Sequence, residues 1–325
     1  MATLPPFEKT AVWARAALSG LPPVPWVGAV EAAARQLEAR LPAGEQVLFE
    51  LRDNGGAADV ALGLDARRGA VARAMRDAPG WGPHRAVLER SAGAVWLEVD
   101  AAQWEGDRPV PGIFWQGGPA LLTAFGLGHL AEAVSVPGPA EFLGVFPARA
   151  QGGVRVCLSM PPDRLGGVAQ RLGLPVAPWS RIRNAAAGGT VRLSLDAGEV
   201  IGPRIGVDIP VRRPGDLARV ARCLPGILPD LPQIGRWCGA APGLDALRAD
   251  EVVPDPVPGR APVWVRRLNH VKITVESGRI GAKIYLFLGL GWPHSASAAR
   301  VIEQASSSRL MASSITSSAK PATSM

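Results

Sequence analysis

The clearest alternation of apolar and polar residues runs between positions 264 and 288. β-Branched residues crowd both halves of this stretch, and a short polar segment at 276–279 separates them, so the pattern predicts one long β-hairpin. Since successive side chains of a strand point to opposite faces, one face is aliphatic and the other is cationic and partly aromatic. The second face holds Arg266, His270 and Lys272 on the first strand and Lys283, Tyr285 and Phe287 on the second. It is either turned toward a ligand or simply solvated, as most charged strand faces are.

Pairs of shorter strands precede this hairpin, and segments with helical spacing lie between the pairs. The predicted strands are 46–52 and 57–64, 93–100 and 111–116, 141–146 and 154–159, and 190–196 and 203–209. The predicted helices are 9–18, 28–41, 67–77, 83–90, 119–134, 162–172, 178–187 and 214–224, with shorter ones near 233–238 and 244–250. A hairpin thus recurs about every 45 to 75 residues, which indicates a repeat of structure.

These elements predict an α+β fold in which five hairpins close into an antiparallel ten-stranded β-barrel surrounded by an outer ring of α-helices. Closure removes both edges of the sheet, and the helices bury the aliphatic strand faces. We expect a single domain at 25–292, with an N-terminal extension at 1–24 and a disordered, Ser- and Ala-rich tail at 293–325. The alternation alone leaves open a one-faced sheet or a two-layer sandwich whose polar faces meet water.

The amino-acid composition indicates which cellular compartment and which kind of binding partner to expect. The 325 residues are 47% hydrophobic, without an uncharged apolar run long enough for a membrane span and without a signal-peptide pattern at the N-terminus. Three widely spaced cysteines fit a reducing compartment, and we expect a cytoplasmic protein without structural zinc or a disulfide framework. The net charge of +7 favours an anionic partner, although an Arg- and Ala-rich composition alone also produces it.

Alternation assigns polar residues in every hairpin to the inside of such a barrel. In strand order they are Glu50 and Arg52, Asp59, Trp96 with Glu98 and Asp100, Phe142, Gly144 and Phe146, Arg155, Cys157 and Ser159, Arg192, Ser194 and Asp196, Arg204 and Asp208, and His270, Lys272, Lys283 and Tyr285. Glutamate and aromatic groups dominate the first half of this series, and arginine and lysine dominate the second. One end of the lumen would therefore suit a diphosphate, and the other an electron-rich acceptor.

The order of hairpins and helices, together with the stretches 153–159, 191–196 and 267–274 with 282–286, resembles the aromatic prenyltransferases of the α-β-β-α barrel (PT-barrel) type. The likeness is nearest to the peptide-modifying branch found in cyanobactin pathways. It implies transfer of a dimethylallyl or longer isoprenoid from its diphosphate to an electron-rich side chain of a ribosomal peptide or to a small aromatic acceptor. It also implies that Lys283 and Tyr285 hold the diphosphate, and that Glu50 orients or deprotonates the acceptor.

The charged lumen residues and the family resemblance together define a candidate site. Glu50 is the expected catalytic residue. The expected diphosphate ligands are Arg52, Arg155, Arg192, Arg204, Lys272, Lys283 and Tyr285. The expected substrate-binding residues are Trp96, Glu98, Phe146, Asp208, His270 and Phe287. Ionising an allyl diphosphate calls for cations around the leaving group and π faces beside the carbocation. No Asp-rich metal motif of the DDxxD kind occurs, so no cofactor is required and Mg²⁺ is optional.

Other functions lack their sequence signals. The chain contains no phosphate-binding GxxxxGK[ST], no HExxH and no GxSxG elbow. Its basic residues are not interleaved with aromatic ones in a single stretch, so neither a nucleic acid nor a membrane is an expected partner. The remaining alternative from another class is a catalytically silent barrel that binds a peptide or an isoprenoid-like ligand in a biosynthetic pathway.

Overall fold

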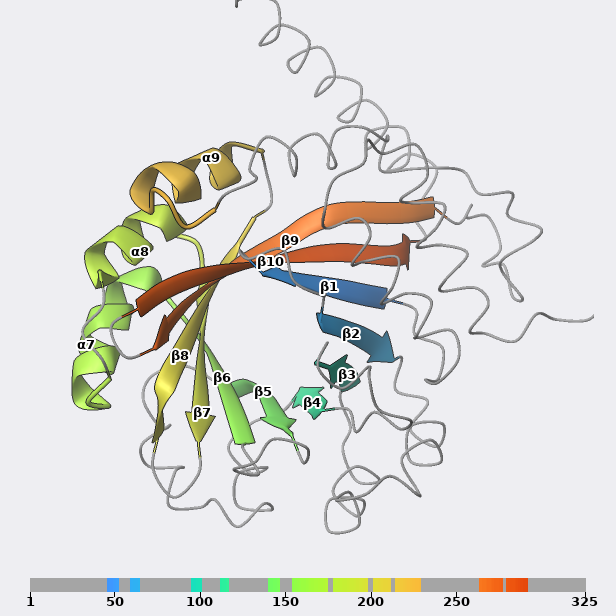
Figure 1. The fold of residues 1–325 in the computed structure, drawn as a ribbon, viewed down its shortest axis with the longest axis horizontal. Helices are drawn as coiled ribbons and strands as arrows, with labels where there is room; N and C mark the ends of the chain where they lie inside the picture. Colours follow the sequence, from blue (N-terminus) through green and yellow to red (C-terminus); the bar gives the residue numbers. More distant parts are fainter. Residues whose placement is uncertain are drawn as a thin grey trace, which may run out of the picture.

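The chain forms a β-barrel with helices against its outer side (Figure 1). The structure is a computed structural model. It describes residues 46–52, 59–64, 95–100, 112–116, 140–146, 154–174, 178–197, 201–211, 214–228, 263–276 and 279–291.

Ten antiparallel strands form one closed sheet, and each strand pairs with its neighbours in sequence. They are β1 (Gln46–Arg52), β2 (Asp59–Leu64), β3 (Val95–Val99), β4 (Gly112–Gln116), β5 (Ala140–Val145), β6 (Val154–Met160), β7 (Val191–Ala197), β8 (Ile201–Pro210), β9 (Val263–Glu276) and β10 (Arg279–Gly291). The ring closes where β1 pairs with β10, in register from Gln46↔Gly289 to Arg52↔Lys283. The predicted ten-stranded barrel is confirmed, and the one-faced sheet and the sandwich are excluded.

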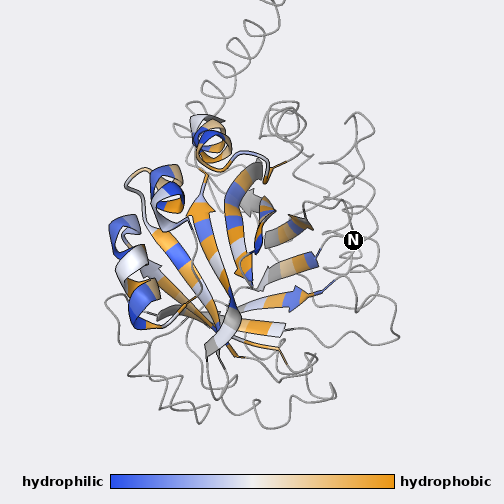
Figure 2. Cartoon of the chain, turned by 60° about the vertical axis from the view of Figure 1, so that its left-hand side comes forward, coloured by the Kyte–Doolittle hydropathy of each residue, from blue (hydrophilic) through white to orange (hydrophobic). Residues whose placement is uncertain are grey.

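Alternation along the strands explains why the sheet closes. Along the strands, hydrophobic and hydrophilic residues form alternating stripes (Figure 2). Outward-facing residues such as Leu193, Val207 and Ile273 are almost completely buried, although they point away from the lumen. Such burial stabilises the barrel by roughly 1.5–3 kcal/mol for each large aliphatic side chain. The hydrophobic core therefore lies outside the barrel wall, and the lumen is left for polar groups.

Three described helices follow one another along one side of the barrel: α7 (Leu165–Arg171), which continues the short 3₁₀ turn η3 (Pro162–Arg164), α8 (Trp179–Ala186) and α9 (Pro214–Cys223) (Figure 1). The helices predicted at 162–172, 178–187 and 214–224 are thus confirmed. Their fully buried residues include Val168, Ile182 and Val220, one on each helix. The first of these helices also ends close to its predicted end, since Gly173 adopts the left-handed conformation (φ +61°) that is common just after a helix.

The side chain of Arg219 links α9 to α8 by hydrogen bonds. Its guanidinium donates to the carbonyl oxygen of Ala185 at 2.9 Å and to Asp216 at 2.8 Å. Asp216 lies in the first turn of α9, where a carboxylate also interacts favourably with the helix dipole. The two helices therefore pack as one layer, in which α8 contacts β8.

The other predicted helices, at 9–18, 28–41, 67–77, 83–90, 119–134, 233–238 and 244–250, lie outside the described residues, as do the extension at 1–24 and the tail at 293–325. The helical layer is therefore established along one side of the barrel only. Within the described ranges, no helix is long and apolar enough to cross a membrane.

A β-bulge corrects one prediction for the final hairpin. Tyr285 pairs with His270, but Leu286 pairs with Leu268, so Asn269 is an extra residue in β9. Beyond this bulge Arg267 takes the position opposite Phe287. The prediction that Arg266 shares a face with His270 is therefore wrong, because an inserted residue reverses the alternation that follows it.

Candidate functional site

A row of charged residues crosses four neighbouring strands on the inner face of the barrel. Lys283 on β10 lies directly opposite Lys272 on β9, Lys272 lies opposite Asp208 on β8, and Asp208 lies opposite Arg192 on β7. Beyond these four strands, Lys283 pairs in the sheet with Arg52 on β1. Like charges directly opposite each other destabilise a sheet. In this sheet each lysine is offset by its own carboxylate, Asp208 for Lys272 and Glu50 for Lys283.

Lys283 is held by Glu50. Its ammonium group donates to one carboxylate oxygen of Glu50, and the hydroxyl of Tyr285 donates to the other. Asp59 adds a second carboxylate, 4.0 Å from the Lys283 nitrogen. Since Glu50 lies opposite both Tyr285 and Asp59 in the sheet, strand pairing alone brings these groups together.

This contact sets the protonation state of Glu50. Burial by itself raises the pKa of the carboxyl group, but the charge of Lys283 and the hydrogen bonds it receives outweigh burial, so that the pKa lies well below its ordinary value. Burial and the negative charge of Glu50 raise the pKa of Tyr285 well above that of a free phenol. Near neutral pH, Glu50 is therefore an ionised acceptor and Tyr285 is a neutral donor.

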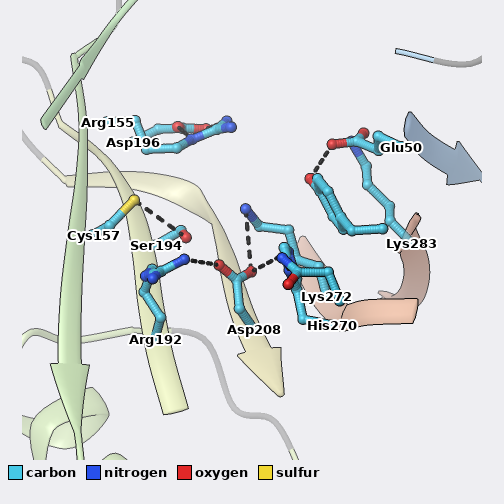
Figure 3. Close-up of polar contacts among 12 residues, drawn as sticks. Glu50, Arg155, Cys157, Arg192, Ser194, Asp196, Asp208, His270, Lys272 and Lys283 are labelled. Atoms are coloured by element: carbon cyan, nitrogen blue, oxygen red, sulfur yellow. Dashed lines mark hydrogen bonds and ion pairs between the residues drawn. The ribbon is translucent and has the colours of Figure 1, made fainter. Parts of the chain in front are cut away.

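A second carboxylate, Asp208, lies close to three basic side chains. Its oxygens lie 3.3 Å from the Lys272 nitrogen, 3.8 Å from a nitrogen of Arg192 and 4.0 Å from His270 Nε2 (Figure 3). Burial acts to raise the pKa of Asp208, but these positive neighbours lower it overall. Among the described residues, its buried Oδ1 accepts no hydrogen bond of good geometry. Asp208 therefore has acceptor capacity that is not fully used.

His270 lies between the two carboxylate centres. Its ring stacks on Tyr285 with the centroids 4.0 Å apart, and its Nδ1 faces the side-chain nitrogen of Asn269 at 3.0 Å. Because an amide nitrogen only donates, Nδ1 accepts and the proton of the neutral ring is on Nε2, toward Asp208. Burial lowers the pKa of His270 to about 4, despite the opposing attraction of Asp208. The ring is therefore neutral at physiological pH.

Two arginines on the neighbouring strands β6 and β7 are each held by a carboxylate and a ring. Arg155 makes a two-point contact with Asp196, at 2.7 and 3.2 Å, and lies 5.0 Å from the centroid of Phe146 (Figure 3). Arg192, already paired with Asp208, lies 5.0 Å from the centroid of Phe142. A guanidinium that is held on two sides loses little further freedom when it binds an anion. Both arginines are therefore preorganised.

Between these arginines lies a buried thiol. Cys157 faces Ser194, with the sulphur 3.6 Å from the hydroxyl oxygen. Burial raises the pKa of the Cys157 thiol, so it is a neutral group of the wall and not a reactive thiolate.

Glycines on the inner face make room for large neighbours. A Cβ atom built on Gly112 would lie 2.4 Å from the ring of Phe146, one on Gly144 would lie 2.6 Å from the ring of Phe114, and one on Gly63 would lie 3.0 Å from the ring of Trp96.

In this wall Phe114 meets Phe146 edge to face, with the ring centroids 5.2 Å apart. On the cationic side, a Cβ atom on Gly206 would lie 2.4 Å from Cε of Lys272. The glycines thus allow an aromatic wall along β3–β5 and place Lys272 flat against β8.

The cationic side chains converge on a pocket that is open to solvent. It is lined by Arg155, Ser194, Asp196, Arg204, Ile205, Gly206, Lys272, Thr274 and Lys283. Its cations come from β6, β8, β9 and β10. At the rim, Arg204 lies 4.0 Å from Glu276, and both side chains are well exposed.

The predicted site residues differ in how they lie relative to this pocket. Of the expected diphosphate ligands, Arg155, Arg204, Lys272 and Lys283 line it, whereas Arg192 and Tyr285 contact Asp208 and Glu50 beside it. The side chain of Arg52 lies outside the described residues. Of the expected substrate-binding group, Glu98, Phe146, Asp208 and His270 are buried, and Trp96 and Phe287 are half-buried.

Alternation did not single out Phe114, Asn269, Thr274 or Gly206, which all belong to the inner wall or to its bulge. The pattern of 111–116 could have indicated Phe114. No local pattern could have indicated Asn269, because a bulge depends on the pairing of two strands.

Comparisons with known proteins do not identify the chain. No protein-family model matches the sequence, and no curated protein aligns with it significantly. Within the described ranges, no three side chains of the metal-binding kinds His, Cys, Asp and Glu come together as a metal site. The family of the protein therefore remains a prediction that rests on the residues themselves.

Proposed function

We propose that the protein is a prenyltransferase of the PT-barrel type, with helices around the whole barrel. The donor is an allyl diphosphate, carrying a dimethylallyl or longer chain, and its diphosphate group binds in the pocket of Arg155, Arg204, Lys272 and Lys283. The acceptor is an electron-rich side chain of a peptide, as in the tailoring of ribosomal peptides, or a small aromatic molecule.

The directly opposed lysines carry this proposal. Lys272 and Lys283 occupy facing positions on β9 and β10, and both line the same pocket. In the empty barrel each lysine is balanced by a single carboxylate, and a diphosphate, which carries more negative charge than either, would attract both. Two further cations reach the same pocket, so the diphosphate would be surrounded from four strands.

The aromatic wall suits the isoprenoid chain of the donor. Phe142 and Phe146 lie against the arginines, and Phe114 packs on Phe146. Isoprenoid chains bury apolar area against such rings, and π faces stabilise the carbocation that forms when the C–O bond to diphosphate breaks. The two electrons of that bond leave with the diphosphate, where the cations of the pocket stabilise the new negative charge.

Glu50 has a matching role in this scheme. The acceptor atom forms its bond to the allyl carbon and must then lose a proton. An ionised, buried carboxylate that faces the lumen can orient the acceptor and receive that proton. The diphosphate would be held by side chains, and a Mg²⁺ ion would be optional. It would then be bound mainly by the diphosphate itself.

One observation favours the second candidate, a silent barrel that binds a peptide or an isoprenoid-like ligand. Each pocket cation already contacts a carboxylate, namely Asp196, Glu276, Asp208 or Glu50. Such a network can exist for structure alone.

Turnover separates the two candidates. The purified protein is incubated with a panel of allyl diphosphates and with linear peptides, cyclic peptides and small aromatic or guanidino acceptors, and diphosphate release and product mass are measured. Transfer should fall about 10²- to 10³-fold in Lys283→Ala and in Lys272→Ala, because each removes one cation from the leaving group. Arg222→Ala, on the exposed side of α9, is the control. An absence of both turnover and diphosphate binding would exclude the proposed donor site and leave the silent barrel.

A further inference from the structure

Among the described residues that line the pocket, Lys283 is the one cation that also contacts the proposed catalytic carboxylate. It lines the diphosphate pocket, yet in the empty barrel its ammonium group donates to Glu50, beside Asp59. A lysine carries a single charge on a long flexible stem, and it cannot contact both sites equally well. We propose that Lys283 is shared: it masks Glu50 in the empty barrel, and donor diphosphate draws it away and frees Glu50 for the acceptor. This inference rests on the proposed function.

The charges on both sides favour such an exchange. In the pocket, a diphosphate brings a far larger negative charge than one carboxylate and lies next to Lys272, so Lys283 gains by turning toward it. On the other side, Glu50 keeps its hydrogen bond from Tyr285 after Lys283 has left. The exchange thus replaces one ion pair with another and leaves no buried lysine unpaired.

Removal of Lys283 also changes what Glu50 can do. Attraction to Lys283 is the largest influence that lowers the pKa of Glu50, whereas burial acts to raise it. Without the lysine, the pKa of Glu50 rises, because burial is then opposed only by the hydrogen bonds of Asp59 and Tyr285. A carboxylate with a higher pKa is a better proton acceptor. Donor binding would therefore prepare the base for the second substrate, and the donor binds before the acceptor.

Tyr285 reports on this exchange in the unmodified protein. It is the single tyrosine of the chain, and its hydroxyl donates to Glu50. Protein with ¹³C at the ring carbon bearing the hydroxyl therefore gives one tyrosine signal by NMR. During titration with inorganic diphosphate we expect this signal to shift and to saturate with the dissociation constant that calorimetry measures. In Lys283→Met, diphosphate bound by the remaining cations should leave the signal in place.

A variant provides the second measurement. Glu50→Gln removes the competitor for Lys283, so inorganic diphosphate should bind about tenfold more tightly than to the wild type. Glu276→Gln, which removes an exposed carboxylate beside Arg204 at the rim, is the matched control and should change binding less than about threefold, since water screens that contact.

The results separate two kinds of failure. If the wild type binds no diphosphate, the proposed function itself is wrong. If the wild type binds diphosphate but the Tyr285 signal does not move, or if Glu50→Gln binds it no more tightly, the donor site stands and the sharing of Lys283 is refuted.

Discussion

The glycine at position 206 is expected to contribute to stability and to anion binding because it provides the surface on which Lys272 lies. Gly206 is buried on β8, and the Cβ atom of an alanine there would lie 2.4 Å from Cε and 3.4 Å from Cδ of Lys272. Carbon atoms prefer a separation of about 3.5–4.0 Å, so the end of the lysine chain must move by more than about 1 Å. Gly206→Ala therefore displaces the ammonium group from Asp208, which it approaches to 3.3 Å.

The expected cost has two parts. Forcing Lys272 into a less favourable rotamer costs about 0.5–1.5 kcal/mol. Weakening the ion pair with the buried Asp208 costs about 1–3 kcal/mol, because the carboxylate loses its nearest cation. Movement of a flexible chain end relieves part of this, so we expect a loss of about 1–3 kcal/mol in the free energy of unfolding and a weaker affinity for diphosphate.

Urea unfolding followed by circular dichroism measures the first effect, and calorimetric titration with inorganic diphosphate measures the second. Gly215→Ala in the first turn of α9 is the control, because no atom lies within 4 Å of the added Cβ. If Gly206→Ala unfolds within about 0.5 kcal/mol of the wild type and binds diphosphate equally well, the packing of Lys272 on Gly206 is not what positions this lysine.

Three further predictions concern Gly167, His270 and Arg155. Gly167 is exposed inside α7, so Gly167→Ala should stabilise the protein by about 0.5–1 kcal/mol in urea unfolding, and an unchanged or lower value would contradict the helix there. The pKa of His270 is about 4 in the folded state and 6.5 when unfolded, so the unfolded chain binds the extra proton. Stability should therefore decrease as the pH falls from about 6.5 toward 4, by on the order of 3 kcal/mol, and His270→Gln should show a smaller decrease between pH 7 and 5. Arg155→Lys loses the two-point contact with Asp196 and should cost about 1 kcal/mol in thermal unfolding, with diphosphate affinity also reduced; equal stability would show that this contact contributes nothing.

The sequence by itself determined the strands and their faces. A period of two over each strand, set by the geometry of extended chain, was enough to predict ten strands and to assign Glu50, Arg155, Asp208 and Lys272 to one face. It was also enough to predict α7, α8 and α9, since helical spacing and the glycine at 173 are local signals. These features depend on residues close together in the chain.

The tertiary structure decided which charges meet. Glu50 and Tyr285 are 235 positions apart, and only the pairing of β1 with β10 brings them into contact. Strand alternation placed Lys283 in the lumen, but it could not show that Glu50 holds this lysine in the empty barrel. Likewise, the bulge at Asn269 depends on a register between two strands, and the position of Lys272 depends on a glycine of the neighbouring strand. Local pattern thus determined the face of the site residues up to the bulge at Asn269, and the closure and register of the barrel determined their partners.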